Sequence, residues 1–208
     1  MDTIHFWDRM SAKYDDISIR RYQKAYDATV ALSRKHLKPT DTVLDFACGT
    51  GLTTVQLAGS VSSVLAIDTS PKMIALAQDK CAGQGAHNVT FAVTTLFDNS
   101  LTESSFDAVL AFNILHGLPE VHEYCTHIHR LIKPGGLFLS ATDCLKEAGI
   151  AAAVLIKTLQ LFNKMPPHVS LMSRKDIVTL IESAGFSILE TQNLFEMPPN
   201  LFVAAQRI

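Results

Sequence analysis

The sequence has few cysteines and shows no pattern for pairing them. Its 208 residues include four cysteines, and none of these has the C-x-x-C spacing of a zinc site or the dense framework of a small secreted domain. The first ten residues contain no basic segment followed by an apolar stretch, and the apolar run at 148–156 ends at Lys157. We therefore expect reduced thiols, no membrane span and a cytoplasmic protein.

An excess of positive charge is also missing. Lysine and arginine number 18 against 20 aspartates and glutamates, which gives a net charge of −2. This balance provides no general attraction to nucleic acid or anionic lipid, so neither is expected as a partner. His122, His127 and His129 fall on one expected helix, but their spacing does not bring two imidazoles together as metal ligands. No metal site is expected.

The sequence does contain enough apolar residues, 48%, for the core of one domain spanning residues 1–208. Residues 1–38 have an amphipathic helical pattern and are expected to form a cap. From residue 39 onward, apolar strand-like segments alternate with helical ones, which predicts a parallel sheet covered by helices on both faces. Strands are expected at 42–47, 63–68, 88–93, 106–112, 136–142, 186–195 and 201–208. Helices are expected after Gly51, from Pro71, from Pro119 to about Leu131, from Asp143 to about Phe162, and from Ser173 to Gly185.

The most informative segment is VLDFACGTGLTT, residues 43–54. An apolar strand leads into a turn with two glycines, and a helix follows. Gly49 and Gly51 allow backbone angles and a close ligand approach that a Cβ atom would prevent. Asp68 ends the next apolar run, where doubly wound sheets place a carboxylate that binds ribose hydroxyls. The turn therefore predicts the floor of a nucleotide-like cofactor site.

Several further motifs occur in a fixed order after this turn. They are Asp68 to Met73, the segment FDAVL at 106–110, the segment NILH at 113–116 and the segment LIKPGG at 131–136. Together with Asp45, Cys48 and the glycines, they resemble the class I S-adenosylmethionine-dependent methyltransferases from about Phe6 to the end of the chain. The resemblance implies a doubly wound, seven-stranded, mostly parallel sheet with an antiparallel last strand. It also implies a cofactor-binding core at 39–208, with a lid insert at about 144–172.

The resemblance assigns the cofactor, S-adenosylmethionine, and its product S-adenosylhomocysteine. Asp45 is expected at the amino acid end of the cofactor, Asp68 at the ribose, Met73 against the adenine and Tyr14 as a closing side chain. Thr95 stands where the family commonly has an acid for the adenine amino group, which leaves recognition of the adenine less defined. The full set of expected cofactor contacts is Tyr14, Asp45, Ala47, Gly49, Gly51, Asp68, Thr69, Met73, Thr95, Leu96, Phe112 and Asn113.

Catalysis requires few protein groups, because the sulfonium is itself a good leaving group. His116 is the candidate general base if the acceptor arrives protonated, since imidazole titrates near neutral pH. A polar residue at a helix start is the alternative role for His116. Cys48 is rejected as a nucleophile because no base partner is visible. The acceptor is expected to be a small molecule, and the sequence does not define the oligomeric state.

Two other functions remain open. A nicotinamide-dependent oxidoreductase could use the same sheet, but Thr54 occupies the place of the third glycine and no hydride-site pair is found. Such a domain would also tend to end in a parallel strand. A binding module that keeps the cofactor pocket without catalysis is the other alternative, and Thr95 in place of an acid is its motivation.

Overall fold

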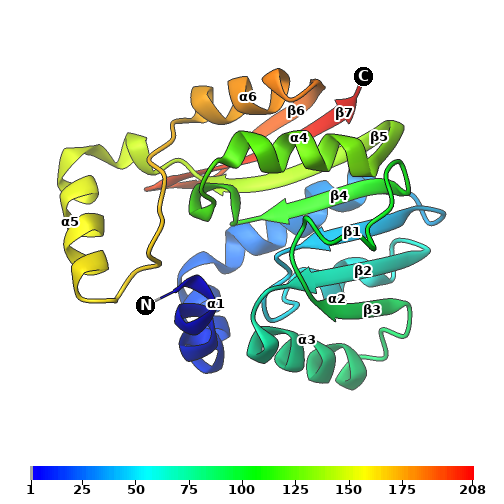
Figure 1. Ribbon diagram of the computed structural model, residues 1–208, viewed down its shortest axis with the longest axis horizontal. Helices are drawn as coiled ribbons and strands as arrows, with labels where there is room; N and C mark the ends of the chain where they lie inside the picture. Colours follow the sequence, from blue (N-terminus) through cyan, green and yellow to red (C-terminus); the bar gives the residue numbers. More distant parts are fainter. Residues whose placement is uncertain (1) are drawn as a thin grey trace.

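The computed structural model describes residues 2–208, so Met1 of the expected cap lies outside the described residues. Seven strands form one sheet in the order β3-β2-β1-β4-β5-β7-β6 (Figure 1). β7 runs antiparallel to β5 and β6, whereas β1 to β5 pair in parallel. The expected sheet is confirmed. The strands are β1 (Thr42–Phe46), β2 (Ser63–Asp68), β3 (Val89–Val93), β4 (Phe106–Phe112), β5 (Ile132–Asp143), β6 (Phe186–Glu196) and β7 (Pro199–Arg207).

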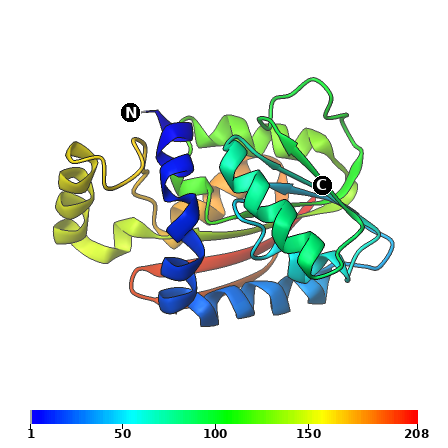
Figure 2. The ribbon, with the colours of Figure 1, turned by 90° about the horizontal axis from the view of Figure 1, so that it is seen from below.

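Helices cover both faces of the sheet and bury a separate apolar core on each (Figures 1 and 2). One face packs against α1 to α3 through Val30, Leu57 and Ile74. The other packs against α4 and α6 through Ile128 and Ile177. The helices are α1 (Thr3–His36), α2 (Thr54–Ala58), α3 (Pro71–Gly83), η1 (Leu115–Gly117), α4 (Val121–Leu131), η2 (Leu145–Ala148), α5 (Gly149–Leu161) and α6 (Arg174–Ser183). Among residues 2–208, no helix combines the length and apolar character that a membrane span needs.

Two boundaries differ from the expectations by more than two residues. β5 begins at Ile132 rather than at residue 136, and residues 134–136 lie inside the strand at an irregularity where the register with β4 shifts. The added length comes from Ile132, which pairs with Phe106 ahead of the shift. The helix expected from Asp143 is divided into η2 and α5, because Gly149 at the junction has a φ of +87°.

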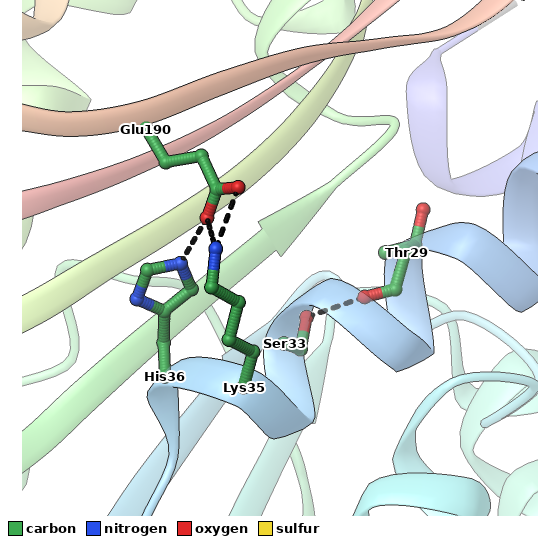
Figure 3. Close-up of polar contacts among 5 residues, drawn as sticks. All are labelled: Thr29, Ser33, Lys35, His36 and Glu190. Atoms are coloured by element: carbon green, nitrogen blue, oxygen red, sulfur yellow. Dashed lines mark hydrogen bonds and ion pairs between the residues drawn. The ribbon is translucent and has the colours of Figure 1, made fainter.

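Helix α1 consists of two arms that meet at Tyr22, where φ is −124° and ψ is 15° (Figure 2). The second arm packs on the sheet and is fixed to β6 through Glu190. The Glu190 carboxylate accepts hydrogen bonds from Lys35 Nζ at 2.8 and 2.9 Å and lies 2.6 Å from His36 Nε2 (Figure 3). The first arm is thereby directed across the carboxyl ends of the strands.

The order of the strands determines where a ligand can bind. β1 is flanked by β2 on one side and β4 on the other, so the chain direction across the sheet reverses between β1 and β4. In open parallel sheets, ligands bind outside the carboxyl ends of the strands at this reversal. The residues that end β1 and β4 here are Phe46 and Phe112.

Candidate active site

The two glycines of the turn after β1 have different functions. Both have positive φ, +56° at Gly49 and +74° at Gly51, which disfavours other residues. A Cβ atom at Gly51 would lie 3.0 Å from Ala77 Cβ, so this glycine allows α3 to pack closely on the turn. At Gly49, a Cβ atom would meet nothing within 4 Å. Gly49 therefore leaves open space above the backbone, while Gly51 serves packing.

Asp68 holds the glycine turn from the end of β2. Its Oδ2 accepts a hydrogen bond from the Gly49 amide at 3.0 Å, and its Oδ1 accepts one from the Ser70 amide at 2.8 Å. The N-cap of α3 is Ser70 rather than Asp68, since the Ser70 hydroxyl accepts a hydrogen bond from Met73 N at 3.1 Å. Burial raises the pKa of Asp68. Each carboxylate oxygen retains a free lone pair for a ligand hydroxyl.

Asp45 is a buried carboxylate, only 2% exposed, at the next-to-last residue of β1. Its carboxylate accepts a hydrogen bond from Thr54 Oγ1 at 2.6 Å, and no lysine, arginine or histidine among residues 2–208 forms an ion pair with it. Burial, with a further contribution from the negative charge of Asp68, raises the pKa of Asp45 to about 7. Two adjacent acids without a cation make this a site that favours a positively charged ligand.

The first arm of α1 covers the turn and is held by two of its own carboxylates. Asp8 accepts hydrogen bonds from Ser70 Oγ at 2.5 Å and from the Lys72 amide at 3.4 Å. Asp15 accepts one from Thr50 Oγ1 and another from Lys80 Nζ at 2.6 Å. The arm thus contacts both the glycine turn and α3.

A cavity of about 30 Å³ lies between this arm and the turn. Tyr14 closes one side, and its hydroxyl lies 3.2 Å from that of Tyr26. The lining includes six of the expected cofactor residues, namely Tyr14, Asp45, Ala47, Gly49, Phe112 and Asn113. Five further residues line it that the sequence analysis did not assign, namely Tyr26, Cys48, Thr50, Leu52 and Thr53.

Asn113 and His116 follow β4 at the same edge of the sheet. Asn113 has a φ of +56°, and its backbone N–H donates a hydrogen bond to Ala141 O at 2.6 Å. Its side chain is thereby directed toward the cavity that it lines. His116 lies in η1, and its Nδ1 is buried without a hydrogen-bond partner among the described residues. Burial lowers the pKa of His116, and the negative charge of Asp143 opposes this shift. The imidazole is therefore neutral near pH 7.

The other expected residues lie around the cavity or away from it. Met73 is 2% exposed on α3, and Leu96 is fully buried in the loop after β3. Thr95 is exposed in that loop, and nearby Asp98 is bound by its own loop through Thr94 Oγ1 at 2.5 Å and Ser100 N at 2.8 Å. These two hydrogen bonds explain the lowered pKa of Asp98, about 2, and leave it as a loop acid. Thr69 is half-buried between Asp68 and the cap of α3.

Comparison with known proteins identifies the family. A family described as "Methyltransferase domain" matches residues 43–136, which include the glycine turn, Asp68 and the β4 edge. The ubiquinone biosynthesis O-methyltransferase of Sinorhizobium fredii is 27% identical over 159 residues, which cover 75% of this chain and 64% of that relative. The chain belongs to the class I S-adenosylmethionine-dependent methyltransferases.

Solved structures of such methyltransferases share the fold. A chain of the complex between the Haloferax volcanii Trm112 methyltransferase activator and a methyltransferase superposes with a TM-score of 0.79 at 18% identity, covering 97% of this chain and 98% of that one. Geranyl diphosphate methyltransferase, solved in complex with S-adenosylmethionine, gives a TM-score of 0.72 at 15% identity and covers 87% and 85%. The chain spans less than two thirds of the first curated relatives, 64% and 54% of their lengths.

Within this methyltransferase, the sequence analysis missed the residues that α1 contributes. Asp15 directly follows Tyr14, and Asp8 is seven residues earlier, so both lie two helical turns apart on the first arm. A pair of acids at this spacing indicates a shared helix face, but the sequence does not show what that face contacts. Burial and the charges of Asp45 and Asp68 raise the pKa of the Cys48 thiol, which disfavours the thiolate that a nucleophile would need.

Proposed function

We propose that this chain transfers a methyl group from S-adenosylmethionine to a small-molecule acceptor by in-line displacement. The observation that carries the proposal is a pair of carboxylates beside a glycine turn, the buried Asp45 and the half-buried Asp68, neither of which forms an ion pair within residues 2–208. S-Adenosylmethionine carries a sulfonium and an ammonium group, and its ribose presents two adjacent hydroxyls. Its charge and its hydrogen-bond donors therefore complement what this edge of the sheet offers.

The same pair of acids argues against a nicotinamide cofactor. A dinucleotide brings a pyrophosphate with two negative charges to the glycine turn. Here the buried Asp45 lies under that turn with its pKa already raised to about 7, so an anion would meet uncompensated like charge. The oxidoreductase alternative is not favoured.

The individual contacts follow from this orientation of the cofactor. Asp45 binds the amino group of the methionine end, which lies over the open space at Gly49, while Asp68 accepts hydrogen bonds from the ribose hydroxyls. Ala47, Gly51 and Thr69 contribute backbone along this path. Met73 and Leu96 give the adenine an apolar surface, and Thr95 offers a hydroxyl or its backbone to the adenine amino group.

The cofactor supplies a methyl group on a good leaving group, so the protein mainly positions the acceptor and excludes water. Phe112 and Asn113 face the end of the cavity where the sulfonium is expected. His116 accepts the proton of an acceptor hydroxyl as that oxygen attacks, a role that suits an imidazole neutral at pH 7. Loss of positive charge at the sulfur then weakens the attraction of the two acids for the product, which keeps its ammonium group.

Entry of the cofactor requires the first arm of α1 to move. Sites for ligands of this size measure roughly 300–1,000 Å³, and the cavity under the arm measures about 30 Å³. The contacts of Asp8 and Asp15 with Ser70 and Lys80 are the ones that must break. Their return after binding would close Tyr14 over the cofactor and shield the reaction from water.

For the acceptor, we propose a small, partly apolar metabolite, with residues 144–172 as its lid and residues 1–208 as one methyltransferase domain. The Sinorhizobium fredii relative carries an O-methyltransferase name in ubiquinone biosynthesis, and geranyl diphosphate is the molecule in the name of the structural neighbour. Both names refer to small molecules, and we do not propose nucleic acid as the methyl acceptor. Four free buried cysteines support a cytoplasmic setting.

The test is a thermal and calorimetric titration with S-adenosylhomocysteine. The protein should melt at a higher temperature with this ligand, and Asp68→Ala should weaken binding about 10- to 100-fold, since hydrogen bonds to a charged group contribute roughly 1.5–3 kcal/mol. Asp79→Ala, which removes an exposed acid of α3, is the control and should bind as the wild type does.

Unchanged affinity of Asp68→Ala would defeat the ribose assignment. Stabilisation by NAD instead would favour the oxidoreductase, and binding without turnover of any acceptor would favour a non-catalytic module.

A further inference from the structure

Asn200 begins a polar cluster on the acceptor side of the site. It lies just after the hairpin that joins β6 to β7, directly opposite Asp143 in the antiparallel pairing of β5 with β7. Its Nδ2 donates one hydrogen bond to Asp143 Oδ1 at 2.7 Å and another to Asn113 Oδ1 at 2.9 Å. Asn200 therefore connects the ends of β5 and β7 to Asn113, a residue of the cavity lining.

These contacts fix the orientation of the Asn200 amide. A carboxylate oxygen can only accept, so the Asn200 atom near Asp143 must be the nitrogen, and both of its hydrogens are used. The Oδ1 atom then faces away from both partners. It is buried and accepts no hydrogen bond among the described residues, and Asn200 as a whole is 6% exposed. A buried acceptor without a donor is unfavourable unless a ligand provides one.

His116 presents a second unpartnered atom in the same region. Its buried Nδ1 lacks a partner among residues 2–208, and the charge of Asp143 acts on its imidazole. The Asp143 charge also acts on Tyr22 at the bend of α1. None of the described lysine or arginine side chains donates a hydrogen bond to Asn113, Asp143 or Asn200. The cluster of these three side chains thus offers hydrogen-bond acceptors that no described lysine or arginine occupies.

The geometry points to Asn200 as a specificity-determining residue that binds a hydrogen-bond donor of the methyl acceptor. This inference rests on the proposed methyl transfer. The acceptor carries two donor groups side by side: the hydroxyl that is methylated and a neighbouring hydroxyl or amine. The first gives its proton to His116, the second donates to Asn200 Oδ1, and Asp143 with Asn113 holds the Asn200 amide in place.

The chemistry balances without any further reactant. The acceptor oxygen forms a bond to the methyl carbon as the sulfur–methyl bond breaks, and the electron pair of that bond remains on sulfur. The hydroxyl proton moves to the His116 imidazole and from there to water. Asn200 takes no part in these bond changes, so its contribution belongs to acceptor binding and should appear in KM rather than in kcat.

The experiment compares two probes, 1,2-dihydroxybenzene and phenol, with 2-aminophenol as a third to distinguish a hydroxyl from an amine as the second donor. Transfer of a tritiated methyl group is measured with wild type, Asn200→Ala and Ser140→Ala. Ser140 is the matched control, because its buried hydroxyl also lacks a partner but alternates on β5 to the face opposite Asp143. Asn200→Leu, which keeps the side-chain volume, replaces the alanine variant if that variant does not fold.

Wild type should use 1,2-dihydroxybenzene or 2-aminophenol at least about 10-fold better than phenol in kcat/KM, the factor that corresponds to one paired buried acceptor. Asn200→Ala should raise KM for the two-donor probes by a similar factor and leave phenol and the affinity for S-adenosylhomocysteine unchanged. Ser140→Ala should behave as the wild type. In protein loaded with S-adenosylhomocysteine, 1,2-dihydroxybenzene should shift the side-chain amide signal of Asn200.

Equal use of all three probes by the wild type, an equal loss for phenol in Asn200→Ala, or no turnover and no amide shift would overturn the inference. In each of these cases, intact binding of S-adenosylhomocysteine and its dependence on Asp68 would leave the cofactor part of the proposed function standing. Failure of that binding would remove the proposed function itself.

Discussion

The two sides of the proposed site are built in different ways. The cofactor side uses a short stretch of chain, from Asp45 to Met73, that is closely packed and carries buried negative charge. The acceptor side joins Asn113, Asp143 and Asn200 from the ends of three strands, and its polar groups are mostly neutral. Beside it, α5 stands away from the sheet (Figure 1), with only Ile156 buried among its residues. The closely packed side with the carboxylates therefore faces the proposed cofactor, which is always the same molecule. The more loosely packed side faces the proposed acceptor, whose identity differs among methyltransferases.

The largest effect that separates the two sides is expected from Asp45→Asn. Removing one partner of a buried charge pair costs about 2–5 kcal/mol, so S-adenosylhomocysteine should bind at least roughly 30-fold more weakly. The measurement is isothermal titration at pH 8. Asp79→Asn, an exposed acid on the same side, should leave the affinity as it is. An Asp45→Asn variant that binds as tightly as the wild type would show that Asp45 does not receive the ligand ammonium.

The same substitution should change how stability depends on pH. The native pKa of Asp45 is about 7 against an ordinary value of 3.8. Between these values the folded protein keeps a proton that the unfolded chain has released, so the free energy of unfolding of the ligand-free protein falls as pH rises. The fall amounts to at most about 4 kcal/mol and is complete above pH 7. Asp45→Asn remains neutral and should lose this part of the pH dependence in urea unfolding curves at pH 5 and pH 8.

A smaller effect distinguishes the two glycines of the turn. Gly51→Ala places a Cβ atom 3.0 Å from Ala77 Cβ at a φ of +74°, and Gly49→Ala meets no atom within 4 Å at a φ of +56°. Both variants carry a backbone strain of about 1 kcal/mol, and Gly51→Ala adds about 1–3 kcal/mol of overpacking. Unfolding curves should therefore rank Gly51→Ala below Gly49→Ala in stability. Gly49→Ala should nevertheless lose more affinity for S-adenosylhomocysteine, because its methyl group enters the open space. If Gly49→Ala were the less stable variant and Gly51→Ala lost more affinity, Gly49 would serve packing and Gly51 would be the glycine beside the ligand.

The sequence predicted the strand, turn and helix of the proposed cofactor side because the information for these elements is local. Strand, glycine turn, helix cap and Asp68 follow one another within about thirty residues, and each has a recognisable residue type. The acceptor side depends on pairs such as Asn113 with Asn200, 87 residues apart. The sequence marks Asn113 as an expected cofactor contact but does not mark Asn200 as its partner, and the register of β5 against β7 brings Asn200 to this edge. The contacts of Asp8 and Asp15 depend in the same way on the bend of α1 at Tyr22.

The smallest effect is expected on α5, and it tests whether the acceptor side is loosely packed. Leu161 is 82% exposed on α5, whereas Leu131 at the end of α4 is fully buried. Leu161→Ser should change the free energy of unfolding by no more than about 0.5 kcal/mol, and Leu131→Ala should cost about 2–5 kcal/mol through loss of apolar burial and the cavity it leaves. Chemical unfolding of both variants measures the contrast, and amide hydrogen exchange should be faster along α5 than along α4. A cost for Leu161→Ser close to that for Leu131→Ala would mean that α5 is packed in solution, and the difference between the two sides would then lie in charge alone.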